Sequence, residues 1–141
     1  YIKLSADTNA NMPAYAVNRM AAILKKRGKI LRQAKILVLG VTYKKDVKDL
    51  RKSPALKLLD LLQSSARQVD FYDPIIPFLK INGIDLNGIA FRERNIRDYD
   101  LVVIATDHSA VDYRLLLRSA RCIFDVRNVY KGVRDPKVIK L

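Results

Sequence analysis

The stretch Lys35-Ile-Leu-Val-Leu-Gly40 decides the fold class. It is a short and nearly continuous apolar run, which is typical of a parallel strand that helices cover on both faces. Leu101-Val-Val-Ile-Ala105 is a second run of the same kind. Two such strands in a chain of 141 residues predict an α/β fold with a central parallel sheet.

The segments around these two strands alternate between helical and strand patterns. Ser53 and Pro54 open a predicted helix that ends near residues 64–65, because Ser is a favoured N-cap and Pro suits the first helical position. The result is a doubly wound, Rossmann-like parallel sheet with right-handed crossovers. The other predicted elements are strands at 68–73, 89–91 and 122–125, helices at 75–79 and 112–118, one helical turn at 95–99, and irregular chain at 127–141.

A long amphipathic helix is predicted ahead of the sheet. Residues 1–9 read as a lead-in, Asn9 or Asn11 is the expected N-cap, Pro13 suits the first turn and Gly28 is the expected stop. The apolar stripe of this helix needs a partner, either this domain or a neighbouring one. It consists of Val17, Met20, Ala21 and Leu24. We therefore divide the chain into an inter-domain and dimerisation helix region at residues 1–33 and a Rossmann-like domain at residues 34–141.

Composition excludes several classes of protein. Lys and Arg number 27 against 14 Asp and Glu, a formal net charge of +13 that predicts an anionic partner such as a phosphate ligand, nucleic acid or lipid headgroup. The single cysteine, Cys122, excludes an intrachain disulfide and is expected in the core. No apolar stretch approaches the roughly 20 residues that span a bilayer. We expect a soluble, cytoplasmic chain that is part of a longer protein.

Topology predicts where a ligand binds. In an open parallel sheet, ligands lie outside the carboxyl ends of the strands, at the point where strand order reverses. Residues 40–46, 106–109 and 126–128 follow three of the predicted strands and should meet there. The basic side chains that these loops carry to one rim are Lys44, Lys45, His108 and Arg127. This arrangement predicts an anion site.

Each of these residues also has a plainer interpretation. The first loop has one Gly and matches neither G-x-G-x-x-G nor a P-loop, so Lys44 is either a phosphate ligand or a solvated loop residue. Tyr43 either stacks on a base or packs against the protein. For His108 we favour a structural role, in which it donates to a backbone carbonyl. Arg51 either pairs with Asp49 or reaches an anion near the helix that starts at Ser53.

The motifs of the chain resemble a known family. Lys35-Ile-Leu-Val-Leu-Gly-Val-Thr-Tyr-Lys-Lys-Asp46 and Asp49-Leu-Arg-Lys-Ser-Pro-Ala55 resemble the C-terminal, UDP-binding domain of the UDP-glucose/GDP-mannose dehydrogenase family. Tyr72-Asp73-Pro74, Ala105-Thr-Asp-His108 and Phe124-Asp-Val-Arg-Asn128 follow in the same order. The form of the second motif is most similar to members that oxidise UDP-N-acetylhexosamines, such as UDP-N-acetylglucosamine or UDP-N-acetylmannosamine.

The resemblance implies roles for particular residues. It places Tyr43, Lys44 and Arg127 at the UDP-sugar, and Arg51 near an NAD that is bound mainly by the N-terminal half of the family's enzymes. The family commonly has Glu where this chain has Lys52, which makes the orientation of Arg51 here less constrained. The resemblance also implies a homodimer through the helix at residues 11–27.

The resemblance implies an oxidoreductase that converts the sugar C6 alcohol to a carboxylate with NAD. The NAD-binding domain and the catalytic Cys of the family lie outside these residues, and Cys122 does not stand in the catalytic motif, so we predict no catalytic residue, no metal site and no activity for this chain alone. The alternative is a basic α/β module that binds nucleic acid or another polyanion without catalysis. Scattered basic residues without a recognition-helix or RNA-binding signature favour the UDP-sugar and disfavour nucleic acid.

Overall fold

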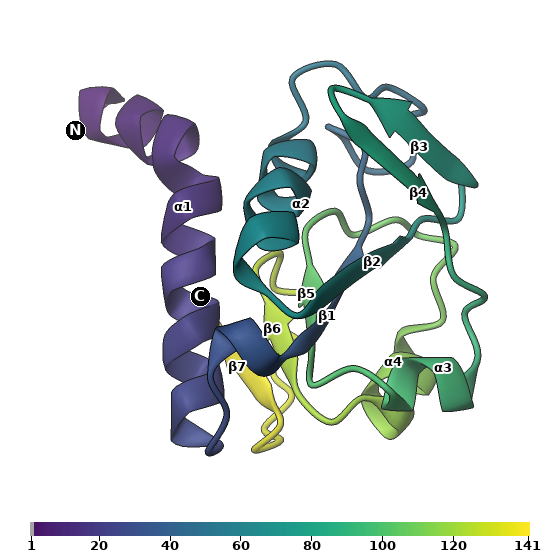
Figure 1. Ribbon diagram of the computed structural model, residues 1–141. Coiled ribbons are helices and arrows are strands. Elements are labelled where there is room, and N and C mark those ends of the chain that lie inside the picture. The colour runs from purple at the N-terminus through teal and green to yellow at the C-terminus, as the bar shows by residue number, and fades with distance from the viewer. Residues whose placement is uncertain (1) are drawn as a thin grey trace.

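A five-stranded parallel sheet forms the centre of the domain (Figure 1). The computed structural model describes the backbone of residues 2–141 and the side chains of residues 12–141. The strands lie in the order β2-β1-β5-β6-β7, so strand order reverses between β1 and β5 as predicted. Their bounds are β1 Lys35–Leu39, β2 Gln68–Tyr72, β5 Leu101–Ile104, β6 Ile123–Asp125 and β7 Val138–Lys140.

Helices cover both faces of the sheet, which confirms the doubly wound architecture. Successive side chains of a strand point to opposite faces, and Ile36 and Val38 of β1 belong to one apolar cluster while Leu37 and Leu39 belong to another. The first cluster packs under α1 and α2, and the second under α3 and α4 (Figure 1). The helices are α1 Ile2–Lys26, α2 Pro54–Ser65, α3 Glu93–Arg97 and α4 Tyr113–Ser119, with a 3-10 turn at Leu31–Gln33.

Helix α1 begins earlier than the sequence predicted. It starts at Ile2, so the predicted lead-in is wrong, and Pro13 lies inside the helix rather than in its first turn. The residues expected as N-caps, Asn9 and Asn11, lie within the helix as well. Apolar periodicity marks where a helix is buried and not where it begins, which explains the error. The expected stop is confirmed, because Gly28 follows the last turn with a φ of 80°.

The apolar stripe of α1 packs against this domain's own core. Met20 and Leu24 are buried, and Ala16 and Ile23 are buried beside them in the cluster that also contains residues of α2 and of the sheet. Val17 is half-buried at the edge of that cluster. The exposed face of α1 carries Tyr15. The predicted boundary between residues 33 and 34 stays a prediction.

The segment between β2 and α3 folds differently from the prediction. Strands β3 Phe78–Ile81 and β4 Ile84–Asn87 form an antiparallel hairpin, in place of the helix expected at 75–79 and the strand expected at 89–91. The turn is Asn82-Gly83, with φ values of 52° and 81°. An Asn-Gly pair between apolar residues is a strong hairpin signal, and it explains why the chain reverses here.

Strand β7 is a further correction, because residues 127–141 were predicted to be irregular. Val138, Ile139 and Lys140 pair in parallel with β6. A run of three residues is too short to show a period, so its pairing depends on the neighbouring strand. Other predictions are confirmed: α2 begins at Pro54, the helix expected at 112–118 is α4 at Tyr113–Ser119, and Cys122 is buried. The carboxylate of Asp112 caps α4 through the Leu115 N–H.

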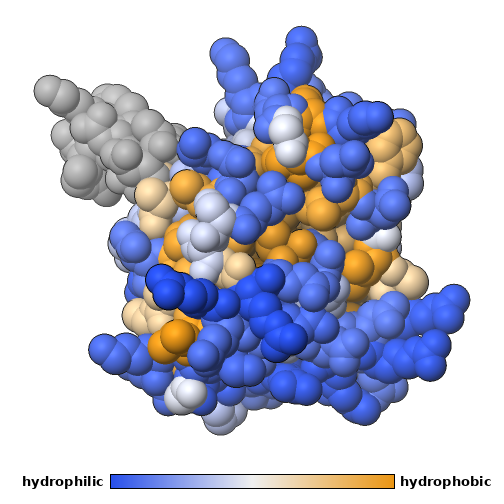
Figure 2. Space-filling model, in the orientation of Figure 1, coloured by the Kyte–Doolittle hydropathy of each residue, from blue (hydrophilic) through white to orange (hydrophobic). Residues whose placement is uncertain are grey.

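Hydrophilic side chains cover most of the face seen in Figure 2, with smaller apolar patches between them. In the part of the chain that the structure describes, no helix is both long enough and apolar enough to cross a membrane.

Candidate functional site

A cavity of about 670 Å³ opens at the carboxyl ends of β1, β5 and β6. The three loops predicted to meet at this edge all contribute to its wall, through Tyr43, Thr106 and Arg127. This is the edge where strand order reverses, so the position of the cavity agrees with the topological prediction. The helices that close its sides contribute Met12, Pro13 and Ala16 from α1, and Pro54, Ala55 and Leu58 from α2.

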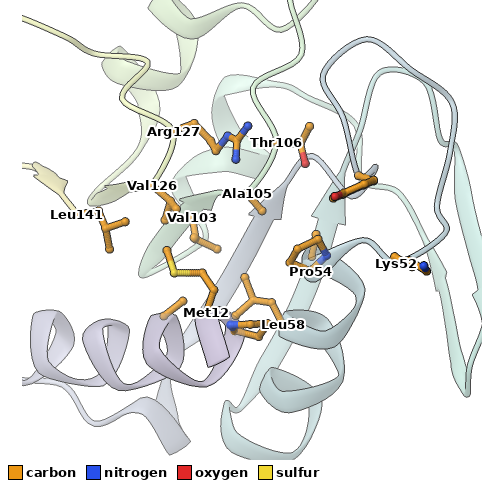
Figure 3. A pocket seen from close by; sticks show the side chains of 14 residues that line it. Met12, Lys52, Pro54, Leu58, Val103, Ala105, Thr106, Val126, Arg127 and Leu141 are labelled. Atoms are coloured by element: carbon orange, nitrogen blue, oxygen red, sulfur yellow. The ribbon is translucent and has the colours of Figure 1, made fainter. Parts of the chain in front are cut away.

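Among the residues whose side chains the structure describes, two basic ones line this cavity. Arg127 follows β6, and Lys52 precedes α2. Figure 3 shows them on opposite sides, with Ala105 and Pro54 between them in that view. The rest of the wall is largely apolar, which is the usual composition of a small-molecule site with a few polar groups that orient the ligand.

The loop that carries Arg127 is held by a buried carboxylate. Asp125 accepts hydrogen bonds from the Val129 N–H at 2.9 Å and from the Tyr130 N–H at 2.8 Å. These bonds close a tight turn in which Asn128 has a φ of 60°. Arg127 projects from the turn, and its Nε lies 3.5 Å from Oδ1 of Asp107 on the neighbouring loop.

His108 is the centre of the hydrogen bonds between the first and second loops. Its Nδ1 accepts the backbone N–H of Asp46 at 2.9 Å, so the ring proton is on Nε2. Nε2 lies 2.9 Å from Oδ2 of Asp73 and 3.0 Å from the hydroxyl of Thr42. Asp73 also accepts the Val41 N–H, at 2.8 Å. The His108 imidazole therefore connects Asp73, directly after β2, to Thr42 and Asp46 of the first loop.

This geometry confirms the structural role that we favoured for His108, but it corrects the expected position and the expected partner. The side chain is completely buried, so it does not reach the rim with the other basic residues. Its partners are the carboxylate of Asp73 and a backbone N–H, not the backbone carbonyl that was expected. The sequence could not show this, because those partners lie 35 and 62 residues away.

Asp46 provides a second link between the same two loops. Its carboxylate accepts the Ser109 N–H at 2.8 Å and the Ser109 hydroxyl at 2.6 Å, and these hydrogen bonds hold the pKa of Asp46 below its usual value. The hydroxyl of Thr106 donates to the Thr42 carbonyl at 2.6 Å. The loop that carries Tyr43 is thus attached to the Thr106–Ser109 loop at several points.

Gly40 allows β1 to leave the sheet close to the second loop. Its φ is 84°, and a Cβ at this position would lie 2.2 Å from the Thr106 carbonyl oxygen. Only glycine combines this backbone conformation with so close an approach.

The predicted binding residues are only partly brought together. Tyr43 is half-exposed and lines the cavity with Arg127. Lys44 and Lys45 are exposed and do not line it. Lys52, which the sequence marks only as a departure from the family motif, does line it.

Arg51 pairs with Asp49, which confirms one of its two predicted interpretations. Its Nε lies 3.1 Å from Oδ1, and its NH2 lies 3.1 Å from Oδ2 of the same carboxylate. These bonds lower the pKa of Asp49. The guanidinium is exposed and does not line the cavity.

Helix α2 begins at Pro54 as predicted, but the predicted side-chain cap by Ser53 is absent. The Ser53 hydroxyl donates to the Val41 carbonyl at 2.7 Å and caps no N–H of α2. It therefore ties the start of α2 to the end of β1, beside the cavity.

Comparison with known proteins identifies the class of domain. The sequence model described as the UDP-glucose/GDP-mannose dehydrogenase family, UDP binding domain, matches residues 37–132. A UDP-N-acetyl-D-mannosamine dehydrogenase from Pyrococcus horikoshii is 32% identical over 135 residues, which are 92% of this chain and 30% of that protein. The protein of the same name from Methanococcus maripaludis is 28% identical, again over 92% of this chain and 30% of its own length. The chain thus spans about 30% of the curated relatives it matches.

Solved structures agree with the sequence comparisons. The UDP-D-ManNAc dehydrogenase structure from Pyrococcus horikoshii superposes with a TM-score of 0.79 at 30% identity, over 99% of this chain and 32% of that one. The UDP-N-acetyl-mannosamine dehydrogenase of Staphylococcus aureus gives a TM-score of 0.71 at 29% identity, over 95% and 32% of the two chains. The match extends over α1 as well as the sheet, since it covers almost the whole chain.

Proposed function

Because the chain belongs to the UDP-glucose/GDP-mannose dehydrogenase family and carries its UDP binding domain, we propose that the cavity at the carboxyl ends of β1, β5 and β6 holds a UDP-sugar. The observation that carries the proposal is that Tyr43 and Arg127, from loops that are far apart in the sequence, both line one cavity. An aromatic face and a guanidinium are suited to a nucleobase and a diphosphate.

Each predicted ligand residue has a definite part in this proposal. The Tyr43 ring packs on the nucleoside, and Arg127 donates to the diphosphate. Lys44 follows Tyr43 on the same loop and meets the ligand where it extends beyond the cavity. The carboxylate of Asp107 forms an ion pair with the Arg127 guanidinium and orients it before the ligand binds.

The activity belongs to a longer enzyme in this proposal. The names of the relatives support a UDP-N-acetylhexosamine as the substrate. In our proposal, as the family resemblance implies, it is oxidised at C6 with NAD that is held mainly by a part of the enzyme outside these residues. Arg51 approaches that NAD from its exposed position. The chain alone oxidises nothing, since its one thiol, Cys122, is buried in the core.

The proposed homodimer through the helix at residues 11–27 uses the outer face of that helix. Met20 and Leu24 are already buried against the sheet, so they are not available to a second copy. Tyr15 lies on the exposed face and is the large apolar side chain that a partner would cover.

Calorimetric titration of UDP into the 141-residue chain tests the binding site. A charge-assisted hydrogen bond contributes about 1.5–3 kcal/mol, so Arg127→Ala and Lys44→Ala should each weaken UDP binding about ten- to a hundredfold. Lys26→Ala, which removes an exposed charge at the end of α1, should leave it unchanged. Equal losses in the three variants, or affinity that collapses steeply with salt, would mean that UDP is held by diffuse positive charge.

A further inference from the structure

Lys52 brings to the cavity a positive charge that has no partner among the described side chains. Its amine has no carboxylate within 4.0 Å in that part of the chain, whereas the second basic residue of the wall, Arg127, is close to Asp107. Lys52 is exposed at the edge of this cavity, and a lining lysine without a described carboxylate partner favours an anionic ligand group at that place.

The start of α2 adds to the positive potential beside Lys52. The Ser53 hydroxyl is directed to the Val41 carbonyl instead of the first helical N–H groups. The first turn contains no acidic residue, and Pro54 and Ala55 of that turn line the cavity. The positive end of the helix dipole is therefore not compensated by a side-chain cap, and Lys52 stands immediately before it.

The backbone holds Lys52 in an uncommon conformation. Its φ is 57°, in the left-handed region that a lysine adopts at a cost, and such residues are concentrated at functional sites. The Ser53 N–H donates to the Leu50 carbonyl at 3.3 Å and closes the turn that contains it. This turn brings Lys52 to the wall of the cavity while Arg51, one residue earlier, is directed to Asp49.

We infer that Lys52 is a specificity-determining residue that binds a phosphate of the ligand opposite Arg127, so that the cavity selects a nucleoside diphosphate over the less charged nucleoside monophosphate and nucleoside. The inference rests on the proposed function, because it assigns a phosphate contact within the same cavity. It adds a cation that the family motif does not provide, since that motif commonly has an acid at this position.

The test compares three ligands and two matched variants. UDP, UMP and uridine are titrated by calorimetry into the wild-type chain, Lys52→Gln and Lys48→Gln. Lys48 is an exposed lysine nearby in the sequence that does not line the cavity, so it controls for loss of one charge. Lys52→Gln should weaken UDP binding about tenfold, weaken UMP binding less and leave uridine binding unchanged. Lys48→Gln should change none of the three.

Failure of this inference can be told apart from failure of the proposed function. If the wild-type chain binds no UDP, or if Arg127→Ala binds UDP as well as the wild type, the site itself is wrong. If Arg127→Ala loses UDP binding but Lys52→Gln does not, the site is right and the role of Lys52 is overturned. Equal losses of UDP, UMP and uridine in Lys52→Gln would also overturn it, because a phosphate contact cannot affect uridine. Urea unfolding of each variant establishes that the titrated chain is folded.

Discussion

Replacing His108 with leucine should both destabilise the domain and weaken UDP binding. The imidazole is completely buried and bridges Asp73, Thr42 and the N–H of Asp46. Leucine fills part of the volume but makes none of these hydrogen bonds. In this variant Oδ2 of Asp73 still accepts the Val41 N–H. The buried carboxylate therefore loses one of its hydrogen bonds but not all of them.

The size of the effect follows from the contacts. A hydrogen bond to a charged group contributes about 1.5–3 kcal/mol and a neutral one about 1 kcal/mol, so the bonds to Asp73 and to the Asp46 N–H together contribute about 3 kcal/mol. For a chain of this size, about 1 kcal/mol corresponds to roughly 3–4 °C in Tm, so we expect a decrease of roughly 10 °C. The freed loop carries Tyr43, so the affinity for UDP should also decrease, by about tenfold.

Two measurements separate positioning from general loss of stability. Thermal unfolding gives the Tm, and calorimetric titration of UDP well below that Tm gives the affinity of the folded protein. Tyr113→Phe is the control, because the Tyr113 hydroxyl donates to the backbone carbonyl of His108 and leaves the imidazole contacts in place. It should lower stability with little change in affinity. A His108→Leu protein that binds UDP within about twofold of the wild type would refute the view that His108 positions the binding loop.

Three further outcomes follow from the same geometry. Gly40→Ala should lower the free energy of unfolding by about 3 kcal/mol in urea titrations, because it combines a left-handed φ with a clash against Thr106, and a cost below about 1 kcal/mol would contradict the close approach. Asp125→Ala should leave the Val129 and Tyr130 N–H groups unpaired and lower the free energy of unfolding by about 2–4 kcal/mol in the same urea titrations. It should also weaken UDP binding, because these hydrogen bonds hold the turn that presents Arg127. Burial raises the pKa of Cys122, so its thiol should resist iodoacetamide at pH 8 in the native protein and react on unfolding, whereas rapid native labelling would show that it is accessible.

Local patterns in the sequence determined the architecture. The apolar runs at residues 35–40 and 101–105 identify central parallel strands, because a strand covered on both faces must be apolar at consecutive positions. Pro54 marks the start of α2, since its fixed φ suits the first helical position. Once the strands are known, topology brings their carboxyl-end loops to one edge, and the cavity lies there.

Weaker or unrecognised local signals account for the errors in the fold. The Asn82-Gly83 pair marks the hairpin in the sequence, but our prediction has a helix at 75–79, a strand at 89–91 and no element at 80–88. Strand β7 had no such signal, because three residues show no period and their extended conformation depends on pairing with β6.

The side chains at the site were decided by the tertiary structure. The sequence predicts His108 on a rim loop and favours a structural role, but its burial and its partners Asp73 and Asp46 come from segments distant in the sequence. Lys44 is the lysine of this loop that the sequence marks as a ligand candidate, yet of Lys44 and Lys52 only Lys52, whose φ is 57°, lines the cavity. Periodicity reports which face of an element is buried, but the direction of a loop side chain depends on backbone angles and long-range hydrogen bonds that exist only in the folded chain.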